Sequence, residues 1–467
     1  MSTLGYGGGV LALPDALGGW PWLVGGEPPP LPDPVAAIDG ALRRPDGAPA
    51  LETFVEPGDR VVVVIQTEIP AAPRELCIRR VAELLRSAGC AEISWLEATG
   101  STHNPGGCRP LELRRSQEPD EGGRSNGPAH RGVSHRASEG AVATYGPASA
   151  GDQLGGGFEP IGWVRGLSEP EASERKGALS RDARVKVSAS PSPRAGHLQP
   201  KVAAPLRRAD KLILVGMGSF DPIAGFGGGA QLAALGCADP ATSRALLLRG
   251  VEAGATQLQQ TFAAVMELLP PAFLVQIELQ RGDRMAAIFA GDPRRAFAAS
   301  TAFHRRWHER ELEGPLDLIV ASAGGEPADW DLSAALPSLL AAASALRPGG
   351  GLIFAAACPG GLGQLDRIPI EACPCPSERS AAAGGSPKDR AGRGSALSRI
   401  LHAALADRHC WIVSEGLVEF ETTALGLSLS SDLETAVESA RLAGISLDRV
   451  AILEGSRTIP ALPSNPR

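Results

Sequence analysis

Strand-type hydrophobic runs alternate with helical patterns in the first part of the chain. Residues 57–66, PGDRVVVVIQ, form a β-branched run typical of a buried strand, and residues 91–100, AEISWLEATG, form another. Between them, residues 73–90 carry apolar side chains at helical spacing: Leu76, Ile78, Val81, Leu84 and Leu85. A strand, a helix and a strand in succession predict a right-handed crossover in a parallel sheet, with ligands bound at the carboxyl ends of the strands.

The same alternation returns after residue 207 and continues to the end of the chain. The pattern predicts strands at 208–218, 273–279, 284–291, 316–325, 349–363, 409–416 and 449–455. It predicts helices within 243–269, 292–312, 330–346 and 432–444. We therefore expect an α/β protein with two α/β domains, mostly parallel sheets and a cleft between the domains.

Residues 110–200 interrupt this pattern. They are rich in Gly, Ser, Pro and charged residues, and such segments bury too little apolar surface to offset the entropy of ordering. We expect a largely disordered insertion, with short ordered stretches around GAVATYG and GFEPIGWV. A chain of 467 residues has room for two domains, which we place at 1–300 and 301–467.

Charge and composition exclude some classes of partner. The net charge is −7, and acidic and basic residues are mixed, so no basic stripe suits a nucleic acid. No apolar run approaches the roughly 18–20 residues that cross a bilayer, and the N-terminus lacks the basic start of a secretory signal. We expect a cytoplasmic protein with a small-molecule partner, whose eight scattered cysteines are reduced thiols.

Several short motifs, taken in order, resemble the nickel-dependent lactate racemases and their relatives. They are AGFGGGAQ at residues 224–231, FAGDP at 289–293 and GGEP at 324–327, and their combination is more specific than any one alone. The order of the segments resembles that family along nearly the whole chain, and it is weakest in residues 110–200. The resemblance implies lactate racemase-like N-terminal and C-terminal domains.

The resemblance also implies an activity and a cofactor. Proteins of this family are 2-hydroxyacid racemases or epimerases, which are isomerases, and they use a nickel-pincer nucleotide. Its pyridinium ring is bound to a lysine and takes hydride from C2 of the substrate, while paired histidines exchange the hydroxyl proton.

Several positions that match the chemical residues of that family hold other residue types here. The tethering lysine is matched by Gln231, and the nickel-ligating histidine is matched near Leu247, whose aliphatic side chain has no lone pair. One acid–base histidine is matched by Asp221, and the other is retained as His103. We therefore name no metal ligand, although the glycines that shape the loops remain.

The residues and the resemblance together give a candidate site. We expect His103 and Asp221 to form the catalytic proton-transfer pair. The expected cofactor-binding residues lie in two loops that follow strands: Thr99, Gly100, Gly225, Gly227, Gly228, Gly229 and Gln231. Glycines with positive φ would let the second loop present N–H groups to an anion at a helix start, but a purely structural turn needs the same glycines.

Other clusters suit a metal less well. His304 and His308 have i, i+4 spacing, and we interpret them as part of a solvated basic face on a surface helix. Cys358, Cys373 and Cys375 lack the second pair of ligands that a thiolate site needs.

Two functional hypotheses follow. The first is an isomerase that acts on a small hydroxy acid with a nickel-pincer nucleotide. The second, which Gln231 and Leu247 favour, is a non-catalytic relative that binds a small anionic ligand or a protein partner. Neither hypothesis involves a nucleic acid or a membrane.

Overall fold

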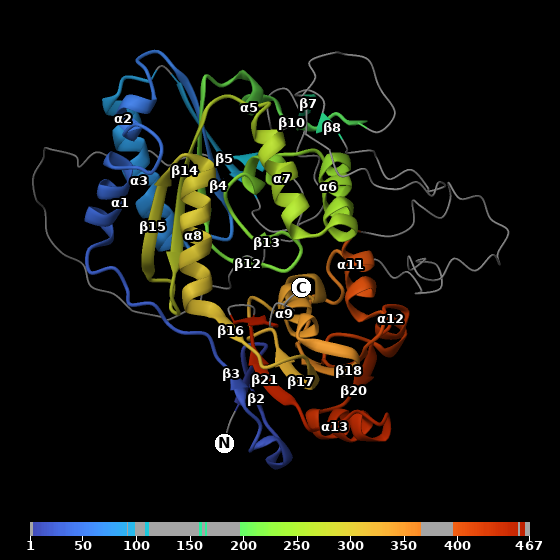
Figure 1. Cartoon of the computed structure of the whole chain (residues 1–467). Coiled ribbons are helices and arrows are strands. Elements are labelled where there is room, and N and C mark those ends of the chain that lie inside the picture. Colours follow the sequence, from blue (N-terminus) through green and yellow to red (C-terminus); the bar gives the residue numbers. More distant parts are fainter. Residues whose placement is uncertain are drawn as a thin grey trace, which may run out of the picture.

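Two six-stranded sheets, each flanked by helices, build the molecule (Figure 1). The computed structural model describes residues 3–90, 92–98, 108–111, 158–160, 164–165, 197–365, 396–455 and 458–462. Both sheets consist mainly of parallel strands with helical crossovers, as the alternating pattern predicts. The expected α/β fold is therefore confirmed.

The first sheet has the strand order β15-β14-β11-β4-β5-β6. The strands span β4 Arg60–Gln66, β5 Glu92–Ala98, β6 Cys108–Pro110, β11 Lys211–Met217, β14 Ala272–Leu279 and β15 Met285–Gly291. The four central strands are parallel, and the edge strands β15 and β6 are antiparallel to their neighbours. All four parallel strands therefore have their carboxyl ends at one edge of the sheet.

The second sheet has the order β20-β19-β18-β17-β21-β3, and all its pairings are parallel. The strands span β3 Trp22–Leu23, β17 Leu316–Ser322, β18 Leu346–Ala355, β19 His409–Val413, β20 Ser428–Ser430 and β21 Val450–Glu454. Strand β3 comes from the start of the chain and pairs with β21. The N-terminal segment thus lies against the second sheet, and the division at residue 300 stays a prediction.

The helices begin where the sequence supplies caps. They span α1 Pro34–Arg43, α2 Leu51–Phe54, α3 Ala71–Ser87, α5 Ala204–Arg208, α6 Pro240–Ala253, α7 Ala255–Met266, α8 Pro293–His308, α9 Leu332–Ser344, α11 Ala396–Leu405, α12 Glu419–Ala424 and α13 Leu433–Leu442. Three of them open with an aspartate N-cap followed by proline at the first helical position, at Asp33, Asp239 and Asp292. The carboxylate accepts orphan N–H groups, and proline needs no partner for the N–H it lacks.

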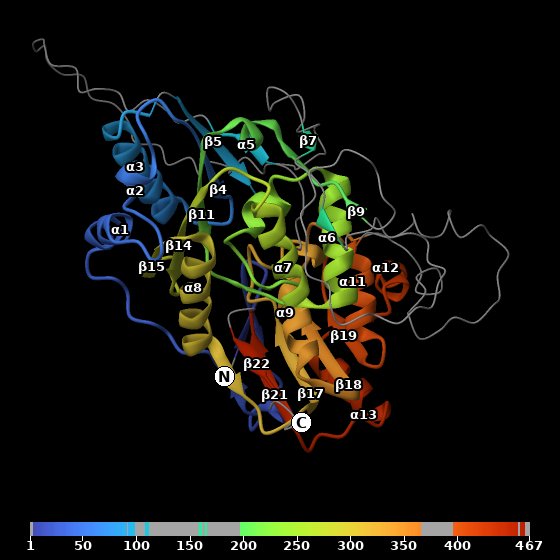
Figure 2. The same cartoon turned by 45° about the horizontal axis from the view of Figure 1, so that its top comes forward.

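Alternate residues of β4 face two different layers. Val61, Val63 and Ile65 belong to the apolar cluster that includes α1, α2 and α3, whereas Val62 and Val64 belong to the cluster on the other face. On that other face, α6, α7 and α8 lie side by side above the second unit (Figure 2). The sheet is therefore buried on both faces, which explains the continuous apolar run in its sequence.

The two units share a buried apolar cluster. Leu247 on α6 and Phe262 on α7 belong to the same cluster as Leu336 on α9 and Leu401 on α11, and α6 packs directly against α11. A cavity of about 320 Å³ lies between the units, with Ile223 and Ile400 in its walls. This cavity is the cleft that the fold prediction placed between the domains.

Part of the interval 110–200 is described. Short strands occur at β7 Phe158–Pro160 and β8 Val164–Arg165, within the stretch GFEPIGWV and next to it. They pair with β10 Lys201–Ala203 and β9 His197–Leu198. The stretch GAVATYG lies outside the described residues.

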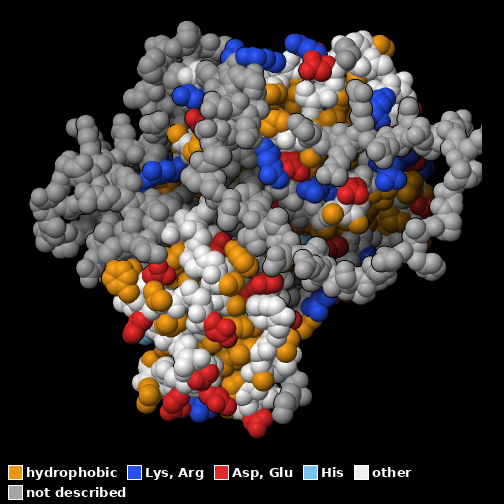
Figure 3. Space-filling view, turned by 180° about the vertical axis from the view of Figure 1, so that it is seen from behind, with side chains coloured by type: hydrophobic (Ala, Val, Ile, Leu, Met, Phe, Trp, Pro, Cys, Tyr) orange, Lys and Arg blue, Asp and Glu red, His pale blue; other side chains and the backbone are white. Residues whose placement is uncertain are grey.

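The surface charges are mixed, as the composition indicates. Seen from behind, acidic side chains gather at the lower end of the molecule, and acidic and basic side chains alternate higher up (Figure 3). Among the helices in the described ranges, none is both long and apolar enough to span a membrane.

A buried histidine on α11 makes the stability of the fold depend on pH. His402 is 8% exposed, and its Nε2 atom has no hydrogen-bond partner among the described residues. Burial lowers the pKa of this imidazole below its usual 6.5 because the charged form loses solvation.

We therefore predict that the free energy of unfolding falls as the pH drops below about 6.5, because the unfolded chain binds the proton first. The loss of stability is complete once the pH falls below the pKa of His402 in the folded protein. The variant His402→Leu should lose less stability between pH 7.5 and 5.5 in urea denaturation than the wild type. The exposed His409→Gln is the control, and equal losses in all three proteins would contradict the prediction.

Candidate functional site

A glycine-rich turn lies at the carboxyl edge of the first sheet. It follows β11 and contains the short antiparallel strands β12 Phe220–Asp221 and β13 Gly225–Phe226. Three of its glycines have positive φ: 80° at Gly225, 92° at Gly228 and 55° at Gly229. These values lie in the left-handed region that glycine adopts without strain, so the turn needs glycine at these positions.

Gln276 of β14 fastens the turn to the sheet. Its buried side chain accepts a hydrogen bond from the N–H of Gly229 at 3.1 Å and donates one to the carbonyl of Gly227 at 3.2 Å. A Cβ atom at Gly228 would collide with the same amide. The N–H of Gly227 donates to the carbonyl of Ser219 at 2.9 Å. The N–H groups of Gly227 and Gly229 are thus used inside the protein.

Asp221 and Gln231 meet at the base of the turn. The Asp221 carboxylate accepts hydrogen bonds from the N–H groups of Ile223 and Ala224, both at 3.0 Å, which closes an Asx-type turn. Its second oxygen accepts a hydrogen bond from Nε2 of Gln231 at 3.3 Å. Asp221 is 4% exposed and Gln231 is fully buried. The two residues therefore form a buried, internally bonded pair.

The positions of the remaining predicted site residues relative to Asp221 and Gln231 are not described. Thr99, Gly100 and His103 lie outside the described residues, as do Cys373 and Cys375. Cys358 is buried after β18, and burial raises the pKa of its thiol to about 12. A thiol in that state is a poor metal ligand at neutral pH. Within the described part of the chain, no three His, Cys, Asp or Glu side chains are grouped to hold a metal.

The interpretation of His304 and His308 as a solvated face is wrong. Both side chains are only 5% exposed, and their rings lie 4.4 Å apart between centroids. His304 Nδ1 lies 3.0 Å from Oε2 of the buried Glu278, whose other oxygen accepts a hydrogen bond from Ser300. The acidic partner comes from β14, which lies near α8 in space but far away in the sequence.

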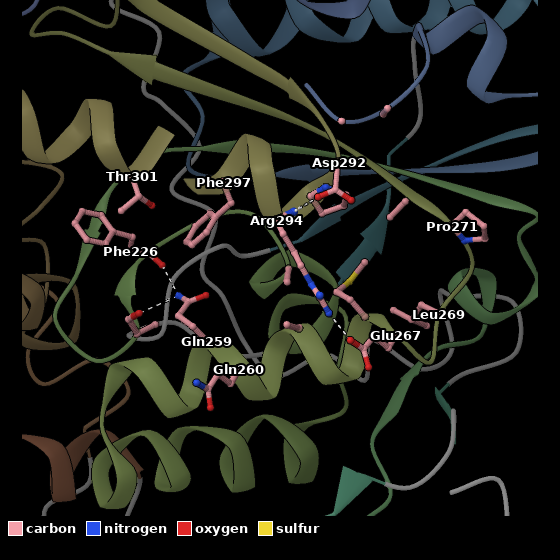
Figure 4. Close-up of a pocket in the computed structure, with 18 of the residues that line it drawn as sticks. Phe226, Gln259, Gln260, Glu267, Leu269, Pro271, Asp292, Arg294, Phe297 and Thr301 are labelled. Atoms are coloured by element: carbon pink, nitrogen blue, oxygen red, sulfur yellow. Dashed lines mark hydrogen bonds and ion pairs between the residues drawn. The ribbon is translucent and has the colours of Figure 1, made fainter. Parts of the chain in front are cut away.

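A second, larger cavity opens beside the glycine turn. It has a volume of about 800 Å³ and lies between α7 and α8 (Figure 4). Phe226 of the turn and Phe297, Thr301 and Arg305 of α8 belong to its walls. The sequence analysis missed this site. The spacing of Phe297, Thr301 and Arg305 by four residues is the one signal in the sequence that they share a helix face.

The buried Glu278 gives a prediction about stability. Replacing it with alanine leaves the hydroxyl of Ser300 and the imidazole of His304 without their acceptor, so Glu278→Ala should lower the free energy of unfolding by about 3–5 kcal/mol. Urea denaturation measures this change. Glu438→Ala, which removes an exposed ion pair with Arg441, is the control and should cost less than about 1 kcal/mol. A loss for Glu278→Ala no larger than that of the control would contradict the prediction.

No protein-family model matches the chain, and no curated protein matches its sequence. Among solved structures, the chain is similar to the lactate racemase apoprotein from Thermoanaerobacterium thermosaccharolyticum, with 17% identity, 99% of each chain covered and a TM-score of 0.64. It is also similar to a protein from Thermotoga maritima, with 13% identity, 94% of this chain and 100% of that chain covered, and a TM-score of 0.52. At such identities the likeness concerns the fold alone. The chain therefore has a lactate racemase-like fold.

Proposed function

We propose that this chain is a ligand-binding protein on a lactate racemase-like fold, which binds a small anionic molecule and does not racemise hydroxy acids with a nickel-pincer nucleotide. The observation that carries the proposal is the buried hydrogen bond between Gln231 and Asp221. By the resemblance, these two positions match the tethering lysine and one of the acid–base histidines.

The residues do not fit the nickel-pincer nucleotide. Gln231 has a carboxamide in place of an amine, so it cannot form the covalent link that a lysine forms. Its side chain is fully buried and bonded to Asp221, which leaves no free reach toward a cofactor. Leu247, near the position of the nickel ligand, is fully buried in the apolar cluster shared by the two units. An aliphatic side chain in such a cluster supplies no electron pair to a metal.

Proton exchange by Asp221 is also poorly supported. A general base must lie within hydrogen-bond reach of the proton that it takes. Both Asp221 oxygens already accept hydrogen bonds, from two backbone N–H groups and from Gln231, and the residue is 4% exposed. These contacts support a structural role, in which the carboxylate fixes the turn.

The proposed binding of an anion is supported by the cavity beside the glycine turn. The cavity of about 800 Å³ beside the turn has Arg294 and Arg305 in its walls, and its volume lies within the range of small-molecule sites. None of Gln231, Leu247 and Asp221 lines this cavity. A ligand can therefore bind there although the residues at the chemical positions have changed.

The first test is elemental analysis and intact mass of the protein produced in a host that makes the nickel-pincer nucleotide. We predict no nickel above background, the mass of the unmodified chain, and no racemisation of D- or L-lactate. A lactate racemase produced in the same host is the positive control. Stoichiometric nickel, an added mass that matches the cofactor, or racemisation would each contradict the proposal.

A further inference from the structure

The cavity between α7 and α8 is elongated. Positions three or four residues apart on a helix share a face, and one face of each helix lines the cavity. These faces carry Thr256, Gln259, Ala263 and Glu267 on α7 and its end, and Arg294, Phe297, Thr301 and Arg305 on α8. From Arg294 to Arg305, α8 rises about 16 Å at its helical rise per residue. The cavity is therefore much longer than a three-carbon hydroxy acid in its extended form.

The two ends of the cavity differ in polarity. Phe54, Leu269 and Pro271 line one end, where the charges of Arg294 and Glu267 compensate each other in an exposed ion pair. Thr301 and Arg305 line the other end, beside Phe226 of the glycine turn, and Figure 4 shows Phe226 and Thr301 together there. This arrangement suits a ligand with an apolar body and one polar head.

The charges along the cavity leave the polar end positive. At the end opposite Arg305, Arg294 forms an exposed ion pair with Glu267, so these two charges compensate each other. The carboxylate of Asp292 caps α8 and accepts hydrogen bonds from two backbone N–H groups at 3.1 Å. Arg305 stacks on the Phe226 ring, with its guanidinium carbon 5.3 Å from the ring centroid. Its nearest carboxylate oxygen, on Glu309, is 3.8 Å away, and the Arg305 side chain is 60% exposed. So loose a pair leaves Arg305 able to attract an anion.

A hydroxyl at the same end lacks a partner. The Thr301 Oγ1 atom is buried and makes no hydrogen bond with any described residue. A buried hydroxyl in that state is costly, and a ligand that accepts its hydrogen bond would remove the cost. The neighbouring Gln259 is already engaged, because its Nε2 donates to the carbonyls of Ala224 and Phe226, both at 2.9 Å. Thr301 and Arg305 are therefore the donors that a ligand head would meet.

We infer that the cavity binds a medium- or long-chain monocarboxylate. The carboxylate accepts hydrogen bonds from Thr301 and Arg305, and the hydrocarbon chain runs past Phe297 and Ala263 toward Leu269 and Phe54. This inference rests on the proposed function, because it names the anion class and the site for that function. A carboxylate matches both the guanidinium and the hydroxyl, since it accepts hydrogen bonds and carries the opposite charge.

Isothermal titration calorimetry with hexanoate, octanoate and decanoate tests the inference. We expect one molecule per chain and an affinity that rises about three- to fourfold per methylene, as the burial of each methylene predicts. Decyltrimethylammonium, which has the same tail and the opposite charge, should bind at least tenfold more weakly than decanoate. Lactate should not compete with decanoate.

Two variants test the position of the ligand. Ala263→Phe fills the middle of the cavity and should weaken decanoate binding at least tenfold, whereas the exposed Ala298→Phe on α8 should change it less than twofold. Arg305→Gln should weaken binding about tenfold. Its control is Arg306→Gln, because Arg306 lies outside the cavity and stacks on Trp307. Melting temperatures of all four variants in the absence of ligand show whether each is folded.

The outcomes separate this inference from the proposed function. Absent or non-stoichiometric decanoate binding, or binding that Ala263→Phe and Arg305→Gln leave unchanged, would overturn the inference. If the same preparation holds no nickel and racemises nothing, the proposed function then stands with its anion still to be found. Nickel or racemisation would overturn the proposed function, whatever decanoate does.

Discussion

The hydrogen bonds of one buried amide hold the carboxyl edge of the first sheet in its observed shape. Gln276 is fully buried, and a buried amide must find partners because water is absent. It finds them in the backbone of Gly227 and Gly229, on the far side of the turn. The turn comes so close that Gly228 has no room for a side chain. The short hairpin, the contact of Asp221 with Gln231 and the position of Phe226 all depend on this attachment.

This attachment changes what the glycine turn can do. A glycine-rich turn binds anions when its N–H groups point outward at a helix start. Here the N–H groups of Gly227 and Gly229 donate to protein oxygens, so the turn works as a packed element of the sheet edge. Its contribution to binding is indirect. Gln259 bonds to the carbonyls around Phe226 and so helps to position one wall of the neighbouring cavity.

Packing between the two units explains the apolar residue at position 247. Helix α6 packs against α11 of the second unit, and Leu247 belongs to the apolar cluster that both units share. A histidine in that cluster would need a metal or another polar partner to offset its desolvation. The same principle governs His304, which is buried on α8 and is compensated by Glu278 from β14. The buried imidazole of His304 is therefore compensated by a partner that the first sheet supplies.

The sequence by itself determined the succession of strands and helices. Strands at residues 60–66, 211–217 and 316–322 are buried on both faces, and a strand buried on both faces has a continuous apolar sequence that can be recognised without the structure. It also located the glycine-rich turn, since positive φ is a local requirement. Only the tertiary structure decided which polar side chains meet. The partner of His304 is 26 residues away, the amide that holds the turn is 47 residues from Gly229, and the cavity needs α7, α8 and the start of the chain together. Such contacts depend on how distant segments pack against each other. The pattern of residues that are neighbours in the sequence therefore does not predict them.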